Sequence, residues 1–465
     1  MTNIKFGTDG WRAIIADDYT VDNVTRVAEA TAKFMEERAM KKVVIGYDCR
    51  FGGKMFAEVT ARVLGNHHIE VIMGDHVAST PMVSLGVRKT KADLGIVITA
   101  SHNPPSYNGF KLKSSFGGPS IPDDIAAVES YIPDQPVKEL VSLEAMKEKG
   151  LITYTDLEDM YFDHVMAGFD IEAIRKSAFG IGYDAMYGAG YLIFPRILPE
   201  AVCLHCEYNP SFYGQAPEPI ERNLQPFSDM IKKDPRMQIG IANDGDADRI
   251  GMFDDEGKFV DSHHILLLLL YYLHKHKGMT GKVVITFSVT DKMVQLAKKF
   301  GLEMEVTKIG FKYIAEIMTK EDVLVGGEES GGLAVKGHIP ERDGVWIGLM
   351  ILEFMAKTGK SLRELIQLVY DEVGTFAFDR DDLHITEKQK TEVLDNCKND
   401  KYSAFGNLTI NRTEKLDGFK YYLDNDTWVM IRPSGTEPVL RVYCEAPDRR
   451  TARETLDAVR KELLG

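Results

Sequence analysis

The sequence has few cysteines and no long apolar run. It has five cysteines in 465 residues, which is a small and odd number, and only Cys203 and Cys206 lie close together in the sequence. We therefore expect no disulfide framework. The segment "VCLHCEY" is predicted as a strand, where residues three apart point to opposite faces, which argues against a zinc or redox pair. The richest apolar stretch, Ile265 to Leu273, is far shorter than the roughly 20 residues of a membrane span and is predicted as a buried helix.

A basic excess, a low-complexity tract and a secretory signal are also missing. The net charge of −14 argues against nucleic-acid binding, which depends on Lys and Arg neutralising phosphates, but it allows a small anionic substrate in a locally basic cleft. The opening "MTNIKFGTDGW" has no basic segment followed by an apolar core, so we expect a cytoplasmic protein without a membrane partner. With 44% hydrophobic and 27% charged residues, the composition is typical of globular proteins.

The chain alternates apolar strands with amphipathic helices. This alternation occurs three times and predicts three related α/β modules with mixed sheets, followed by a smaller α+β domain with hairpin-like segments and a helix from Thr451 to Leu464. The predicted domains are 1–148, 149–256, 257–370 and 371–465.

Glycine-rich polar loops follow the central strand of each predicted α/β module. They read "TASHNPPSYNG", "ANDGDADRIG" and "GGEESGG", and the fourth domain adds "RPSGTEP". Because ligands of open α/β sheets bind beyond the carboxyl ends of the strands, we expect these loops to line one central cleft.

The first two loops suggest chemistry, each with a simpler alternative. Ser101 is a weak nucleophile without a base, metal or favourable field, and a turn-capping role would also explain it. Asp244, Asp246 and Asp248 have a spacing suited to Mg²⁺ or Ca²⁺, because three crowded carboxylates repel one another unless a cation holds them; the alternative is a solvated turn. An EF-hand is excluded, since Arg249 replaces the required glycine at position six.

The other two loops offer groups for a phosphate and a sugar. Arg432 has a planar donor fork, and Ser434, Gly435 and Thr436 can add donors to a phosphate, although a hairpin turn is the simpler interpretation. The loop "GGEESGG" carries carboxylates and a hydroxyl that could bind sugar hydroxyls.

Taken together and in this order, the loops resemble those of the α-D-phosphohexomutase family, which includes phosphoglucomutases, phosphomannomutases and phosphoglucosamine mutases. "TASHNPP" resembles the phosphoserine loop, "DGDADR" the metal loop, "GEESGG" the sugar loop and "RPSGTEP" the phosphate loop. "FGTDGWR" is similar to the family's N-terminal motif. The resemblance implies an isomerase that interconverts hexose 1-phosphate and hexose 6-phosphate through a phosphoserine and a hexose 1,6-bisphosphate, which also serves as activator.

The resemblance also implies a role for individual residues. Ser101 would be phosphorylated and would bind Mg²⁺ together with Asp244, Asp246 and Asp248. The groups implied around the transferring phosphoryl are Arg12, His102, Lys111 and Arg249, with Lys111 as a candidate general acid/base. The groups implied to bind the sugar phosphate are Glu328, Ser330, Lys308, Arg432, Ser434, Gly435 and Thr436.

Substrate preference depends on fewer positions. Glu329 and Gly332 stand where mannose-handling and glucosamine-handling relatives tend to have other residues, so glucose 1-phosphate is the expected substrate, with mannose possible. Phe311 stands where some dual-specificity relatives have a histidine. The alternatives are a phosphoglucosamine mutase and a sugar phosphatase that passes the phosphoserine group to water. A non-catalytic sugar-phosphate binding protein would not need Ser101, Lys111 and the aspartate loop together.

Overall fold

The computed structural model describes residues 3–7, 9–177, 179–433 and 439–465, and these form two compact units. The first unit comprises Met1–Val284 and Gly310–Ile366, and the second comprises Ile285–Ile309 and Gln367–Gly465. The loops that contain Ser101, Asp244 and Glu328 therefore belong to one unit, which carries most of the candidate site.

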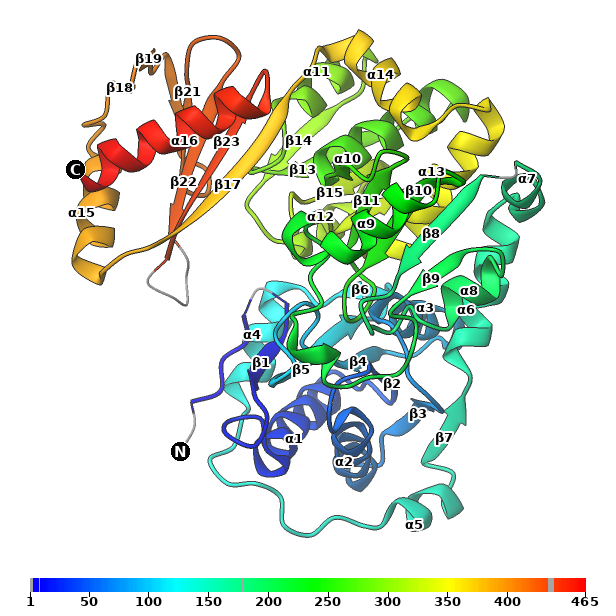
Figure 1. Cartoon of the computed structure of the whole chain (residues 1–465). Coiled ribbons are helices and arrows are strands. Elements are labelled where there is room, and N and C mark those ends of the chain that lie inside the picture. Colours follow the sequence, from blue (N-terminus) through cyan, green and yellow to red (C-terminus); the bar gives the residue numbers. More distant parts are fainter. Residues whose placement is uncertain (1–2, 8, 178, 434–438) are drawn as a thin grey trace. The chain divides into compact units, whose positions relative to one another are not determined.

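The first sheet of the first unit runs in the order β1-β5-β4-β2-β3-β7, with β6 beside β5 (Figure 1). Its strands are β1 (Trp11–Ile14), β2 (Lys42–Tyr47), β3 (Glu70–Gly74), β4 (Leu94–Ile98), β5 (Tyr107–Ser114), β6 (Gly118–Pro119) and β7 (Ile152–Thr155). Strands β4, β2, β3 and β7 pair in parallel, whereas β5 is antiparallel to both β4 and β1. The sheet is mixed, as predicted.

Helices cover both faces of this sheet, which explains why its central strands are apolar throughout. The helices are α1 (Val21–Glu37), α2 (Gly53–Asn66), α3 (Thr80–Thr90), α4 (Pro122–Ser130), α5 (Leu143–Glu148) and α6 (Leu157–Gly168). The next helix, α7 (Ile171–Lys176), packs instead against α13 (Gly344–Thr358). Val24 of α1 and Leu64 of α2 share a core with Ile45 of β2. On the other face α3 lies close, since a Cβ on Gly46 would be 2.4 Å from Val83 Cγ2.

The second sheet runs in the order β12-β11-β10-β8-β9. Its strands are β8 (Gly180–Asp184), β9 (Val202–Leu204), β10 (Met237–Asn243), β11 (Ile250–Asp254) and β12 (Phe259–Val260). The accompanying helices are α8 (Ile193–Ile197), α9 (Gln225–Lys233) and two 3₁₀ turns at Phe212–Gly214 and Glu221–Asn223. Strands β10 and β11 are antiparallel neighbours, so the aspartate loop is the connection of a hairpin.

The geometry predicted for Cys203 and Cys206 was wrong. Strand β9 ends at Leu204, and His205 takes a left-handed backbone conformation with φ of 50°. The chain therefore turns between the two cysteines, and the Cys206 thiol hydrogen-bonds Cys203 and lowers the pKa of Cys203. Both cysteines are free thiols.

The remaining part of the first unit contains the leucine-rich segment. Its elements are α10 (Ser262–Tyr271), a π-helical turn (Tyr272–His276), β13 (Lys282–Thr286), α12 (Phe311–Lys320), β15 (Val323–Gly327), β16 (Leu333–Val335), α13 (Gly344–Thr358) and α14 (Leu362–Val373). The last residues of β13 and of α14 belong to the second unit. The leucines at 266–270 are buried, which confirms the predicted buried helix. Among the described residues, no helix combines the length and apolarity needed to cross a bilayer.

The second unit is built around the antiparallel sheet β17-β23-β22-β21-β20. Its elements are α11 (Asp291–Lys299), β14 (Met304–Thr307), β17 (Ala377–His384), α15 (Glu387–Lys398), β18 (Ala404–Phe405), β19 (Leu408–Thr409), β20 (Arg412–Glu414), β21 (Phe419–Tyr422), β22 (Trp428–Pro433), β23 (Val439–Ala446) and α16 (Arg449–Leu464). Asp448 caps α16 by accepting a hydrogen bond from Thr451 N. The buried residues Leu456 and Val459 of α16 share a core with the sheet, which gives the predicted α+β arrangement.

Candidate active site

Ser101 lies in the loop that follows β4, with its side chain buried. Its backbone adopts the left-handed region, with φ of 53°, and its amide donates a hydrogen bond to Thr99 Oγ1 at 2.8 Å. The Ser101 hydroxyl donates to Asp244 Oδ2 at 2.8 Å and lies 3.3 Å from His102 Nδ1. The serine is therefore held against the aspartate loop and an imidazole, and does not simply cap a turn.

The aspartate loop presents Asp244, Asp246 and Asp248, whose carboxylates are buried and offer oxygens that all lie within 4.8 Å of one another. Ala247 has φ of 57°, which turns the chain between them. The Oδ1 atoms of Asp246 and Asp248 are buried without a hydrogen-bond partner. Burial, and next the neighbouring Asp246, raise the pKa of Asp244 well above its usual value, which is the electrostatic consequence of three crowded carboxylates. These orphaned hard oxygens fit a divalent cation.

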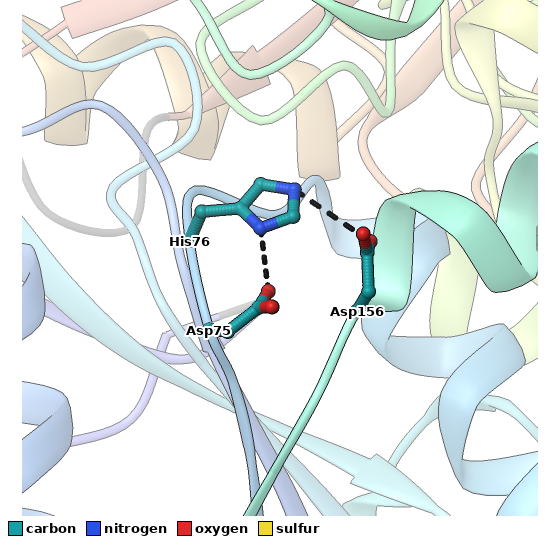
Figure 2. Close-up of side chains that lie close together, drawn as sticks. All are labelled: Asp75, His76 and Asp156. Atoms are coloured by element: carbon teal, nitrogen blue, oxygen red, sulfur yellow. Dashed lines mark ion pairs between the residues drawn. The ribbon is translucent and has the colours of Figure 1, made fainter.

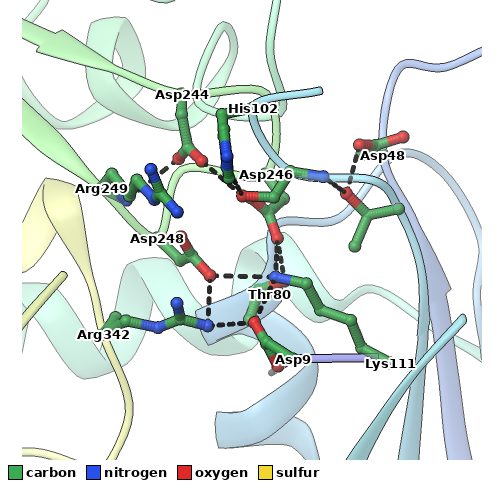
Figure 3. Close-up of polar contacts among 12 residues, drawn as sticks. Asp9, Asp48, Thr80, His102, Lys111, Asp244, Asp246, Asp248, Arg249 and Arg342 are labelled. Atoms are coloured by element: carbon green, nitrogen blue, oxygen red, sulfur yellow. Dashed lines mark hydrogen bonds and ion pairs between the residues drawn. The ribbon is translucent and has the colours of Figure 1, made fainter. Parts of the chain in front are cut away.

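Buried cations from other segments surround the same carboxylates (Figure 3). Lys111 Nζ lies 2.8 Å from Asp246 Oδ2, 3.0 Å from Asp248 Oδ2 and 2.9 Å from an oxygen of Asp9. Arg342 Nη2 contacts Asp248 Oδ2 at 2.8 Å and also pairs with Asp9. Burial by itself lowers the pKa of Lys111, but the charges of these carboxylates raise that pKa above its usual value, so the ammonium stays charged.

Further contacts fix the aspartates and the imidazole. Thr80, at the start of α3, donates its hydroxyl to Asp246 Oδ2 at 2.5 Å, and its amide donates to Asp246 O at 3.0 Å. Burial, then the charges of Arg249 and Arg12, hold the pKa of His102 well below its usual value. The imidazole is therefore neutral near pH 7.

The two arginines predicted near the serine also lie in the first unit. Arg12 Nη1 donates to Asn103 Oδ1 at 2.7 Å, two residues after Ser101. The Arg249 amide donates to Asp244 Oδ1 at 3.0 Å, and its guanidinium lies 3.8 Å from Glu218 Oε1. Two cationic forks therefore flank the serine and aspartate loops.

The sugar loop joins the aspartate loop directly. An isolated antiparallel bridge connects Arg249 with Gly332, and Ile250 N donates to Gly331 O at 3.2 Å. The Glu328 side chain is buried, and that burial raises its pKa although Arg342 and Arg249 oppose the change. The structure thus brings the serine, aspartate and Glu328 loops together within one unit.

Ser330 lies in the turn after Glu328, in the first unit, and the other predicted residues belong to the second unit. Arg432, in β22, has its Nε 3.3 Å from Asp417 Oδ1, and the Ile309 amide, next to Lys308, donates to Asp417 Oδ2 at 2.9 Å. Asp417 thereby links the Lys308 segment to Arg432. The predicted contacts from Ser434, Gly435 and Thr436 lie outside the described residues.

Sequence reasoning missed Asp9, Thr80 and Arg342. Asp9 stands within "FGTDGWR", a motif that pointed only to its arginine, and the polar run "PERDG" before α13 contains Arg342. Nothing local distinguishes Thr80, because its role comes from contact with Asp246, 166 residues away.

A second group of possible metal ligands lies apart from these loops. His76, after β3, has Nδ1 2.5 Å from Asp75 Oδ1 and Nε2 3.7 Å from Asp156 Oδ1, at the start of α6 (Figure 2). These side chains are between one third and one half exposed, and Asp156 already caps α6 through Asp159 N. The group is explained as a surface ion-pair bridge between β3 and α6.

Comparison with protein families gives four consecutive matches. The phosphoglucomutase/phosphomannomutase alpha/beta/alpha domain I matches residues 3–137, domain II matches 159–257, domain III matches 261–373, and the C-terminal domain matches 386–462. Together they confirm three α/β domains followed by a smaller C-terminal domain.

Full-length relatives carry more than one name. The chain is 30% identical over 459 residues to the phosphoglucomutase/phosphomannomutase of Thermococcus kodakarensis, covering 97% of this chain and 96% of that protein. It is 32% identical over 468 residues to a phosphoglucosamine mutase of Methanococcus vannielii, covering 97% of each. A crystal structure from Thermus thermophilus, assigned as a phosphomannomutase, superimposes with a TM-score of 0.88 at 33% identity and covers 100% of both chains.

Proposed function

The chain belongs to the phosphoglucomutase/phosphomannomutase family of isomerases, and we propose that it interconverts hexose 1-phosphate and hexose 6-phosphate through a phosphoserine at Ser101. The observation that carries this proposal is the 2.8 Å contact between Ser101 Oγ and Asp244 Oδ2, made inside a buried group of three carboxylates. A serine needs such an environment to act as a phosphoryl carrier, because its free hydroxyl is a poor nucleophile.

We assign Asp244, Asp246 and Asp248 as the ligands of a Mg²⁺ ion, together with an oxygen on Ser101. The two unpartnered Oδ1 atoms support this assignment, since buried carboxylate oxygens without a partner are costly. When bound, Mg²⁺ supplies positive charge next to the oxygens of the transferring phosphoryl group.

The protein's own cations take a complementary part. Arg12 and Arg249 have planar forks that suit the equatorial oxygens of a phosphoryl group. Lys111 contacts Asp246 and Asp248, so it acts as a countercharge, and it is the proposed general acid/base. His102 lies beside the carrier, with Nδ1 3.3 Å from the Ser101 hydroxyl. Phosphoryl transfer requires mainly positioning and charge neutralisation, which these groups provide.

The catalytic cycle follows from one carrier and two sugar oxygens. Phosphorylated Ser101 transfers its phosphoryl group to the free oxygen of the sugar phosphate, which gives the hexose 1,6-bisphosphate and a free serine. The bisphosphate then reorients in the site, and the Ser101 hydroxyl attacks the phosphorus of the other phosphate. The new bond between Ser101 Oγ and phosphorus replaces the bond to the sugar oxygen, and the serine proton passes through the general acid/base to the sugar oxygen as it leaves. A dephosphorylated enzyme has nothing to donate, so the bisphosphate acts as activator.

The remote end of the substrate would be held by two sets of groups. Glu328 and Ser330 would bind sugar hydroxyls, and Lys308 would add a cation. The set proposed for the non-reacting phosphate is Arg432, Ser434, Gly435 and Thr436. Arg432 is only partly covered and its Asp417 partner is 3.3 Å away, so its fork can turn to a phosphate.

We propose glucose 1-phosphate as the preferred substrate, with glucosamine 1-phosphate as the main alternative because named relatives of both kinds match the chain equally well in length. Gly332 supports the first choice. A Cβ there would lie 2.4 Å from Arg342 Cδ, so a histidine at this position, as in other members, would displace the arginine that pairs with Asp248.

The decisive experiment measures kcat/KM for glucose, mannose and glucosamine 1-phosphates, each with its matching bisphosphate. The highest value is expected for glucose 1-phosphate, and a higher value for glucosamine would overturn the substrate assignment but leave the mutase. Inorganic phosphate is followed in the same reactions, since its stoichiometric release would identify a phosphatase.

A second experiment tests the carrier. Intact-mass measurement after incubation with hexose 1,6-bisphosphate should show a gain of one phosphate for the wild type and none for Ser101→Ala. Phosphate uptake with full activity in Ser101→Ala would refute the central role of the serine.

A further inference from the structure

Arg50 is a buried arginine for which the proposed catalytic cycle has no role. It follows β2, and its side chain is fully inaccessible to solvent. Its two terminal nitrogens donate to main-chain carbonyl oxygens of the serine loop: Ser101 O at 2.6 Å, Asn103 O at 2.6 Å, Pro104 O at 2.9 Å and Tyr107 O at 3.0 Å. One guanidinium therefore gathers the carbonyls of nearly the whole loop around Ser101.

The charge of Arg50 is balanced from its own segment. Asp48 Oδ2 lies 3.3 Å from Arg50 Nε, and Asp48 Oδ1 accepts a hydrogen bond from the Arg50 amide at 3.0 Å. Burial raises the pKa of Asp48 to about 6, so the carboxyl is ionised at neutral pH and neutralises the guanidinium. The buried guanidinium therefore has a charged partner, without which its burial would be strongly destabilising.

Asp48 also reaches the serine through Thr99. The Thr99 hydroxyl donates to Asp48 Oδ2 at 2.5 Å and accepts from the Ser101 amide at 2.8 Å. Arg50 holds the carbonyl of Ser101 and Thr99 holds its amide, so both peptide groups that flank the Ser101 Cα are fixed.

This bracing coincides with backbone strain. Ser101 has φ of 53°, a left-handed conformation that is strained for a residue other than glycine. Strained conformations at functional sites persist only where the surrounding structure determines them. Here the surrounding structure is a fully buried arginine whose donors converge on the strained turn.

We propose that Arg50 is a positioning residue for phosphoryl transfer, and that Asp48, Thr99 and Arg50 form a buried brace that aims Ser101 Oγ at the carboxylates. The inference rests on the proposed function and extends it to a group that touches neither substrate nor metal. Lysine cannot replace the arginine, because a single ammonium cannot reach carbonyls spread over seven residues, from 101 to 107.

The test compares Arg50→Lys with Arg26→Lys, a matched control in the same unit. Arg26 is also buried and donates to a main-chain carbonyl, Pro133 O, at 2.7 Å, but it lies in α1, and its other hydrogen bond among the described contacts goes to Asn23 of the same helix. The readouts are kcat and KM for glucose 1-phosphate per folded molecule, and hydrogen exchange of the amides at 101–107.

In Arg50→Lys we expect kcat to fall by about 100-fold with KM within about threefold, because positioning errors near 1 Å have effects of this size. The loop amides should exchange at least about tenfold faster in the same variant. Arg26→Lys should keep kcat within twofold and leave exchange at 101–107 unchanged.

A folded Arg50→Lys protein with wild-type kcat and unchanged loop exchange would overturn the proposal. A loss of kcat shared by Arg26→Lys would do the same, since it would indicate general destabilisation. If Arg50→Lys does not fold, Thr99→Val tests the same brace, and wild-type kcat in that variant would refute it. If the wild type has no mutase activity but Arg50→Lys still exchanges its loop amides faster, the structural brace is supported and the proposed function is rejected.

Discussion

Gly245 gives the sharpest test of how closely the serine and aspartate loops must approach. The glycine lies between Asp244 and Asp246, and its own φ is not in the left-handed region, so alanine introduces no backbone strain. A Cβ at Gly245 would lie 2.4 Å from Ser101 O and 3.0 Å from Pro217 Cγ. Gly245→Ala therefore perturbs the distance between the loops and little else.

The size of the effect follows from that geometry. Ordinary contacts of a Cβ begin at 3.4 Å, so a gap of 2.4 Å must widen by about 1 Å. Ser101 O cannot move freely, because Arg50 holds it at 2.6 Å, so the loops must separate at the 2.8 Å contact between Ser101 and Asp244. A displacement near 1 Å costs about 10²-fold in rate, and overpacking costs about 1–3 kcal/mol of stability.

The assay is conversion of glucose 1-phosphate to glucose 6-phosphate, with the product oxidised by a coupled dehydrogenase, together with a thermal melt. Gly245→Ala should lower kcat about 100-fold while the protein remains folded at 25 °C. The control is Gly182→Ala in β8, where a Cβ would lie 3.1 Å from the Phe227 ring, which can shift, and kcat should stay within twofold. Wild-type kcat in Gly245→Ala would refute the close-approach argument.

Three further predictions address the metal, the phosphate loop and pH. Asp246→Asn should lower kcat by orders of magnitude, and EDTA should abolish activity that added Mg²⁺ restores. High Ca²⁺ should inhibit, because its larger and more irregular coordination shell places the oxygens differently. Unchanged activity in EDTA would remove the metal from the mechanism. Arg432→Ala should cost about 2–4 kcal/mol in kcat/KM and Arg432→Lys should rescue it only in part, whereas unaltered kinetics would place the phosphate elsewhere. Burial, and next the charge of His338, lower the pKa of His164 from 6.5 to about 4. Between these pH values the unfolded chain is protonated at His164 and the folded protein is not, so Tm should fall as the pH is lowered from 6.5 to 4. His164→Gln should reduce that fall, and an identical Tm profile would contradict it.

The sequence by itself determined the chemical content of the site and the order of the domains. Alternating apolar strands and amphipathic helices predicted the α/β parts, because the repeat of buried residues is a local property of each segment. The loops with Ser101, Asp244 and Glu328 could be predicted as a site because each carries several reactive groups within a few residues. The cysteine pair shows the limit of such local reasoning, since the turn at His205 reversed the predicted orientation.

Only the tertiary structure decided which groups complete the site. Asp9 pairs with Arg342 from 333 residues away, and Thr80 bonds Asp246 from 166 residues away, so no local pattern announces either contact. Arg50 reads in the sequence as an ordinary charged residue after a strand, yet folding removes it from water and turns its donors to the Ser101 loop. The physical reason is that a motif specifies residue types and local backbone geometry, whereas burial, charge pairing and hydrogen-bond partners are fixed by which distant segments the folded chain brings together.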